Sequence, residues 1–96
     1  MENKVIKEID NLLSLIEQYQ LKGVHPQVNT LKELQYSLNH HIKLSTREKI
    51  NIHNALFIPR GGLSELYYMD VNVVQMRFVN EQLSHAFDTI GKFLID

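Results

Sequence analysis

The sequence predicts an all-α fold, a compact four-helix bundle-like domain with a structured connector before the last helix. Two observations lead to this prediction. Apolar residues recur at spacings of three and four over long stretches, as expected of helices that bury one face. Short breaks rich in glycine, proline and helix-capping residues separate these stretches, so neighbouring helices should pack against each other. The 96 residues are enough for one hydrophobic core, and we treat 1–96 as a single domain.

The first helix is expected from Lys4 to Leu21. Asn3 is a residue type that caps helix N-termini, and Gly23 lies where a left-handed glycine often ends a helix. The apolar positions follow the helical repeat and comprise Val5, Ile6, Ile9, Leu12, Leu13, Ile16 and Tyr19.

The second helix begins at residues 24–26, because proline is tolerated in a first helical turn, or a little later with Asn29 or Thr30 as its cap. The short connection to the first helix predicts an antiparallel helical hairpin. Its apolar face comprises Val28, Leu31, Leu34, Leu38 and Ile42.

Ser45 and Glu48 form a capping-box pattern, which predicts a third helix from Thr46 to about Phe57. Proline and two glycines then make the strongest break in the chain, and we expect Pro59, Gly61 and Gly62 to form a turn.

Beyond this break, Ser64 is expected to cap a short helical turn up to Tyr68. Residues 67–79 fit two structures. The alternation from Val74 to Phe78 suits a strand, with a short β-hairpin across Asp70–Asn72. The same region also continues the apolar stripe of a helix, which comprises Val73, Met76, Val79, Leu83, Phe87, Ile90 and Leu94.

The last helix is expected from Asn80 or earlier to Ile95. If its own chain leaves this apolar stripe partly uncovered, a second copy would cover it, so a homodimer is one of the expected assemblies.

Charge and hydropathy narrow the classes of function. The formal net charge is −1, whereas nucleic-acid binders usually carry a clear basic excess. No stretch approaches the roughly 20 apolar residues that span a bilayer, and the N-terminus lacks the pattern of a signal peptide. We therefore expect a cytoplasmic protein without a membrane partner.

No pattern of catalytic or metal-binding residues is evident. The chain contains no cysteine, and no two histidines have the i, i+4 spacing of a helical zinc site. The serines lack a nucleophile elbow, and no spacing forces two carboxylates together. The sequence therefore predicts a protein that is not an enzyme and needs no cofactor.

The segment after the glycines is the most aromatic in the chain. Adjacent tyrosines cannot both face a core, and tyrosine and arginine are enriched at protein–protein hot spots. We therefore predict a partner-binding surface that comprises Arg60, Glu65, Tyr67, Tyr68 and Asp70.

An alternative function is a small DNA-binding transcriptional regulator with a helix-turn-helix around residues 30–57. Its recognition helix would present Arg47, Asn51 and Asn54 to base edges. The slight overall acidity and the lack of a basic arm argue against it.

The run from Pro59 to Tyr68 (PRGGLSELYY), followed by Asn80-Glu81-Gln82-Leu83 and a last helix, resembles a group of small bacterial proteins with a PRGGLSD-aromatic element. These look like the immunity proteins that inhibit secreted bacterial toxins. The chain departs from the pattern at Glu65, where aspartate is more common, and at Gln82, where proline is common. The resemblance implies a protein-binding module, most concretely an immunity-type inhibitor that occludes a toxin or another protein partner.

Overall fold

The computed structural model describes residues 2–58 and 62–95. These residues form four α-helices and one 3-10 turn, with no strand among them. The predicted all-α, four-helix architecture is confirmed. The elements in chain order are α1 (Glu2–Gln18), α2 (His25–Asn39), α3 (Thr46–Leu56), η1 (Leu63–Glu65) and α4 (Val73–Ile95).

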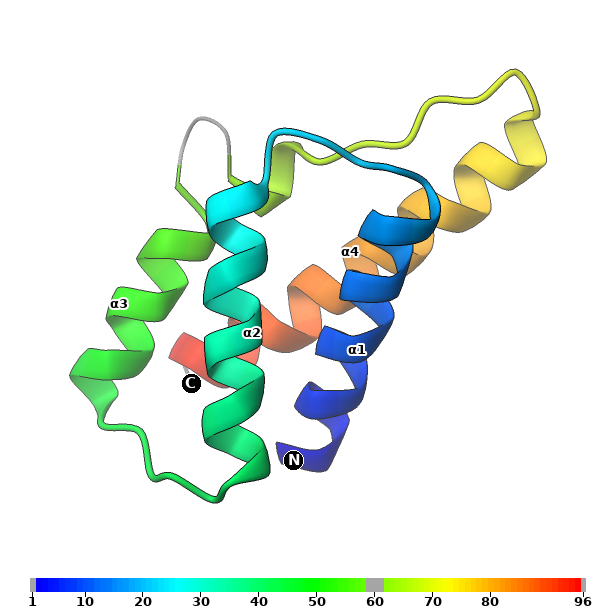
Figure 1. The fold of residues 1–96 in the computed structure, drawn as a ribbon. Helices are drawn as coiled ribbons and strands as arrows, with labels where there is room; N and C mark the ends of the chain where they lie inside the picture. Colours follow the sequence, from blue (N-terminus) through cyan, green and yellow to red (C-terminus); the bar gives the residue numbers. More distant parts are fainter. Residues whose placement is uncertain (1, 59–61, 96) are drawn as a thin grey trace.

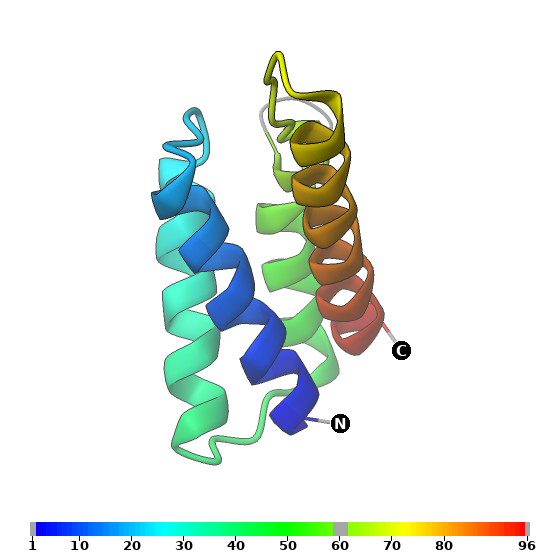
Figure 2. The same cartoon turned by 90° about the vertical axis from the view of Figure 1, so that its right-hand side faces the viewer.

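Successive helices run in opposite directions (Figures 1 and 2). Helix α1 packs against α2 and α4, and α3 packs against the same two neighbours, so the four helices enclose one core. The N-terminal end of α4, with the chain leading into it, projects beyond the other three helices (Figure 1). This projection places one end of α4 outside the bundle.

The core consists of the apolar faces that the helical periodicity predicts. Its buried members include Val5, Ile9, Leu12, Ile16, Leu31, Leu34, Leu38, Leu56, Leu63, Val79, Leu83, Ile90 and Leu94. The prediction fails at Ile42, which is exposed because α2 already ends at Asn39.

Helix α1 begins at Glu2, so Asn3 lies inside it and is not the expected cap. It ends two residues before Gln20, whose φ of 52° is left-handed, and the Leu21 N–H donates to the Ile16 carbonyl at 2.9 Å. This is a Schellman ending formed without glycine. Gly23 does adopt a φ of 85°, but in the loop that follows.

Helix α2 begins at His25, the earlier of the two predicted starts, with Pro26 in its first turn. Its C-terminal end repeats the ending of α1: His41 has a φ of 55°, and the Ile42 N–H donates to the Ser37 carbonyl at 2.9 Å. Helices α1 and α2 form the predicted antiparallel hairpin (Figure 2).

The capping box at the start of α3 is confirmed. The Glu48 N–H donates to Ser45 Oγ, and the Ser45 N–H donates to Glu48 Oε1, each at 3.1 Å. The helix ends at Leu56, one residue before the predicted Phe57.

Of the predicted turn, Pro59, Arg60 and Gly61 lie outside the described residues. Gly62 lies against the end of the preceding segment: a Cβ added to it would stand 2.6 Å from the Ile58 carbonyl oxygen and 2.8 Å from the Ile58 nitrogen. Only glycine permits this approach of backbone to backbone.

The expected cap at Ser64 is wrong. Ser64 lies inside the 3-10 turn η1, Gly62 occupies the N-cap position, and no side chain caps the turn. The turn is anchored by Leu63, which is completely buried, so packing of its first residue replaces capping.

The alternative of a β-hairpin across Asp70–Asn72 is also wrong. The Asn72 N–H donates to Asp70 Oδ1 at 3.1 Å, and Asn72 Oδ1 accepts from the Gln75 N–H at 3.1 Å. These residues therefore build the start of α4 at Val73 instead of a turn between two strands.

Candidate functional site

The segment between η1 and α4, residues 66–72, is called the connector below. Its side chains alternate in exposure, as they do along a strand. Leu66, Tyr68 and Asp70 are partly buried, whereas Tyr67, Met69 and Val71 are exposed. The connector is thus an extended segment with three apolar side chains in solvent.

A side chain from α4 forms the backbone hydrogen bonds that a neighbouring strand would form with the connector. The Tyr68 N–H donates to Asn80 Oδ1 at 2.9 Å, and Asn80 Nδ2 donates to the Tyr68 carbonyl at 3.0 Å. Both backbone groups of one connector residue are satisfied by one amide, so the connector is tied to α4 at its centre.

The Tyr68 hydroxyl ties the connector to its own far end. It donates to Asp70 Oδ2 at 2.6 Å. This hydrogen bond, with burial and the Asp70 charge adding to it, raises the pKa of Tyr68 to about 12. The same bond and a further one from the Asn72 backbone lower the pKa of Asp70.

Tyr19, the residue that follows α1, supports the other side of Tyr68. The rings of Tyr19 and Tyr68 lie 4.6 Å apart at 54°, and the Tyr19 hydroxyl accepts from Gln75 Nε2 at 2.7 Å. Through Tyr68, the connector is therefore held by the residue that follows α1 as well as by α4, and its outward side chains extend from a backbone that these contacts hold in place.

Exposed apolar side chains concentrate at this end of the molecule. Of the eleven large hydrophobic residues exposed among the described ones, six lie between positions 67 and 78, so the exposed apolar residues are concentrated in the connector and the first turns of α4. We call them the apolar tip; its members are Tyr67, Met69, Val71, Val73, Val74 and Phe78.

A groove of about 810 Å³ lies between α4, the C-terminal half of α3 and the connector. Its apolar walls include Phe57, Leu83 and Phe87. A smaller hollow of about 470 Å³ continues along the first turns of α4, and Tyr67 lines both.

The residues of α4 that line the groove recur every three or four positions: Asn80, Ser84, Phe87, Gly91 and Ile95. The groove therefore follows the helix for about 22 Å, at 1.5 Å per residue. A Cβ on Gly91 would stand 3.8 Å from the Phe57 ring, so this ring packs beside the glycine.

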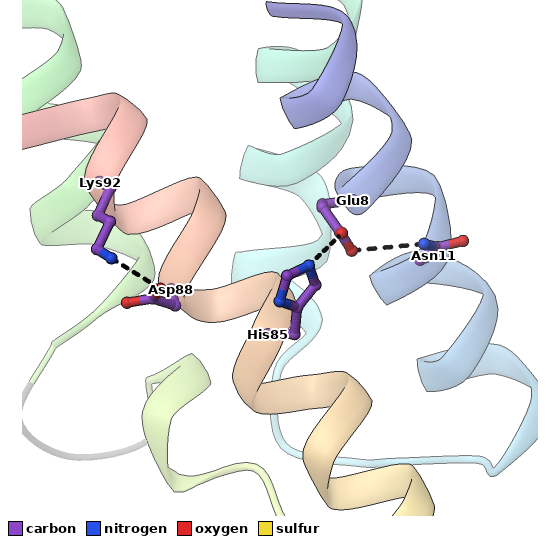
Figure 3. Close-up of polar contacts among 5 residues, drawn as sticks. All are labelled: Glu8, Asn11, His85, Asp88 and Lys92. Atoms are coloured by element: carbon purple, nitrogen blue, oxygen red, sulfur yellow. Dashed lines mark hydrogen bonds and ion pairs between the residues drawn. The ribbon is translucent and has the colours of Figure 1, made fainter. Parts of the chain in front are cut away.

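Figure 3 shows the charged contacts of α4 nearest this surface. Asp88 and Lys92, which line the groove, form an i, i+4 ion pair at 3.1 Å. His85 points instead toward α1, where its Nε2 lies 3.0 Å from Glu8 Oε2, and Asn11 donates to the other Glu8 oxygen at 3.4 Å. The rim of the groove thus carries both signs of charge.

The structure brings together three of the five residues predicted to bind a partner. Tyr67, Tyr68 and Asp70 all lie in the connector, but only Tyr67 is freely exposed; Tyr68 and Asp70 hold the connector in place. Glu65 ends η1 and is exposed, and Arg60 lies outside the described residues.

Sequence reasoning missed the groove and the exposed part of α4. The alternation of Val74 and Phe78 with polar neighbours is the available signal, but it fits a strand as well as a helix, so the sequence leaves residues 67–79 open between the two. In the structure both residues lie on a helix and are exposed.

Neither a metal site nor a membrane-crossing helix is found in the part of the chain that the structure describes. No group of three or more His, Cys, Asp or Glu residues there could hold a metal ion. No described helix is both long and apolar enough to cross a bilayer.

In comparisons with known proteins, no family model, no curated protein and no solved structure matches this chain. The resemblance of the run from Pro59 to Tyr68 to immunity proteins therefore stays a prediction, and the functional argument rests on the geometry of the connector and the groove.

Proposed function

We propose that this chain is a non-enzymatic protein-binding module whose binding site is the groove along α4, with Tyr67 where the two hollows meet. The observation that supports it is the position of Tyr67. Its side chain is 57% exposed, lines both hollows, and comes from a connector that hydrogen bonds already hold in place. An aromatic anchor that is ordered before binding loses little conformational entropy when a partner covers it.

The occupant we propose is an amphipathic helix of the partner protein. The groove is straight because α4 forms its length, and about 22 Å accommodates four helical turns. The small side chain of Ser84 allows a second helix to approach closely, while Phe57 and Phe87 provide apolar contact. The Asp88–Lys92 pair on the rim provides charges that orient the partner without setting a net preference for either sign.

An immunity-type inhibitor is the specific form of this function that the sequence resemblance implies. Its mechanism would be occlusion, in which the surface around Tyr67 covers the active site or docking face of a toxin. The chain would then act at a stoichiometry of one to one, and the complex would block the toxin's activity.

The alternative of a DNA-binding regulator gains no support from the arrangement of the helices. Helices α2 and α3 lie side by side and antiparallel (Figures 1 and 2), whereas the two helices of a helix-turn-helix cross at about 90–120°. Arg47, Asn51 and Asn54 are exposed on α3, so the experiment below includes nucleic acid among its outcomes.

The test compares three purified proteins in affinity capture from lysate of the source cells: wild type, Tyr67→Ala and Tyr36→Ala. Tyr36 is the matched control, because it is 60% exposed but lies on α2. We expect wild type and the control to recover the same protein and Tyr67→Ala to lose it by tenfold or more, as at a hot spot. For the immunity form, the recovered protein would be a toxin whose activity wild type blocks and Tyr67→Ala does not.

Two results would contradict the proposal. One is a partner that all three proteins hold equally, which would place the binding surface elsewhere. The other is recovery of DNA with a steep loss of binding as salt increases, which would favour the regulator.

A further inference from the structure

A second surface on α4 lies outside the groove. Val74 is 79% exposed and Phe78 is 54% exposed, one helical turn apart. At about 100° per residue, Phe78 lies about 160° around the helix from Asn80 and about 120° from Ser84, both of which line the groove. Val74 lies about 120° from Asn80 and about 80° from Ser84. The apolar pair therefore lies outside the larger hollow of the groove.

Two opposite charges accompany this apolar pair. Arg77 and Glu81 are exposed and line the same shallow hollow as Val74 and Phe78. In the described part of the chain, neither of them forms an ion pair or a side-chain hydrogen bond.

The reason is their order along the helix. Asp88 and Lys92, with the acid first, pair at 3.1 Å on the same helix. Arg77 and Glu81 have the reverse order at the same spacing, which is the less favourable orientation within a helix. Both charges are therefore available to another molecule.

We propose that this face of α4 is a homodimer interface, on which a second copy of the chain packs antiparallel about a two-fold axis close to Phe78. In such a contact each surface meets its own copy. Arg77 then lies within reach of the partner subunit's Glu81, and Glu81 lies within reach of the partner subunit's Arg77. The face carries one charge of each sign, so it is complementary to itself.

The remaining surface chemistry fits a second copy. Val71, at 100% exposure, and Met69 extend the apolar contact toward the tip. Exposed patches of more than a few hundred Å² on a monomer mark interaction sites, and a stable dimer buries about 800 Å² on each partner. A net charge of −1 adds little repulsion between two copies.

The interface leaves the larger hollow of the proposed groove open, since none of its residues Val74, Arg77, Phe78 and Glu81 lines it. It covers part of the smaller hollow, which Arg77 and Glu81 line together with Tyr67. A dimer would present two grooves, one on each copy. The two proposals can therefore fail separately.

The experiment measures the molar mass of the full chain by sedimentation equilibrium over a range of concentrations. Wild type is expected to move from the 11.2 kDa monomer to a dimer of twice that mass. With Arg77→Glu, the two acidic residues of one copy face the two acidic residues of the other. With Glu81→Arg, the two basic residues of one copy face the two basic residues of the other. Each variant alone is expected to weaken the dimer by tenfold or more, because like charges then oppose each other.

Two further samples decide whether this face is the interface. The double variant, Arg77→Glu with Glu81→Arg, restores opposite charges and is expected to dimerise as wild type does. An equimolar mixture of the two single variants is expected to form a mixed dimer. Helical circular dichroism of each variant controls for folding, which these exposed side chains should not affect.

A wild type that stays monomeric at all concentrations would overturn the proposal. Single variants that dimerise as tightly as wild type would also overturn it, because the interface would then lie elsewhere. Tyr67→Ala is expected to leave the dimer unchanged, which separates this interface from the groove.

Discussion

At the scale of single residues, the glycines show how differently the same residue type is used. Gly62 is needed because two backbone segments meet there, whereas Gly91 lies within α4 with room beside it. Added methyl groups at the two positions should therefore have opposite effects.

Gly62→Ala is expected to destabilise the fold by about 1–3 kcal/mol, because its Cβ would meet backbone atoms of Ile58 that cannot give way. Gly91→Ala is expected to stabilise it by up to about 1 kcal/mol, because alanine is the better helix former and the Phe57 ring is at ordinary contact distance. Urea denaturation of both variants measures the difference. Equal effects of the two would refute the backbone contact at Gly62.

The hydrogen bond between Tyr68 and Asp70 makes a second prediction about single residues. In wild type, one of the four tyrosines should titrate near pH 12, later than an ordinary tyrosine. Asp70→Asn removes the carboxylate, so the pKa of Tyr68 should fall toward the ordinary range. Ultraviolet absorbance of tyrosinate measures this directly, and Tyr68→Phe identifies the late group.

The stability contributed by this pair has a definite pH range. The folded pKa of Tyr68 is raised, so its contribution is complete below about pH 10 and is lost as the pH rises to about 12. The folded pKa of Asp70 is lowered, so its contribution is present above the ordinary aspartate pKa and is lost as the pH falls through the lowered value. An identical pH profile for Asp70→Asn would show that the bond does not form in solution.

At the scale of elements, the connector depends on a side chain that lies outside it. Asn80→Ala removes both hydrogen bonds to the Tyr68 backbone. We expect the Tyr68 amide to lose its protection from hydrogen exchange, while amides in the middle of α1 and α2 keep theirs. Partner binding through Tyr67 should weaken in parallel, because the anchor would no longer be ordered.

The control for this prediction is Ser84→Ala, a change on the same face of α4 one turn further along, at a residue that lines the groove but forms no bond to the connector. If Ser84→Ala and Asn80→Ala alter exchange at Tyr68 alike, the amide of Asn80 is not what orders the connector.

The helices could be predicted from the sequence because their signals are local. The periodicity of α1 and α2 and the capping box at Ser45 depend on residues within one or two turns. The structure of the connector could not be predicted in this way, because it depends on Asn80, which lies twelve positions beyond Tyr68.

The difference between local signals and contacts of residues distant in sequence also explains which parts of the candidate site could be predicted. Because Tyr67 and Tyr68 are adjacent, the sequence predicts that one of the two is exposed. In the structure Tyr67 is the exposed one. The helical stripe of α4 predicts that its apolar residues share a face, but which of them a neighbour covers depends on how far α4 projects beyond the bundle. Val73 is exposed and Val79 is buried for this reason, although both belong to that stripe.

At the scale of the whole molecule, α1 and α4 join the first and last parts of the chain, and Glu8 and His85 lie at their junction (Figure 3). The Glu8 side chain is only 11% exposed, so it meets solvent little and depends on His85 and Asn11. A nearly buried carboxylate stabilises a fold less than an apolar residue of similar size, provided that residue packs well.

Two variants at this junction should therefore differ in sign. His85→Ala removes a hydrogen-bonding partner and leaves the carboxylate poorly solvated, so we expect a loss of about 1 kcal/mol at neutral pH. Glu8→Leu removes the carboxylate itself and extends the apolar face formed by Val5, Ile9 and Leu12, so we expect no loss or a gain of similar size. Thermal and urea denaturation of both variants and of the double variant measure the coupling between the two side chains. If His85→Ala lowers the free energy of unfolding equally in the Glu8→Leu background and in wild type, the two side chains are not coupled. The junction would then be held by apolar packing alone.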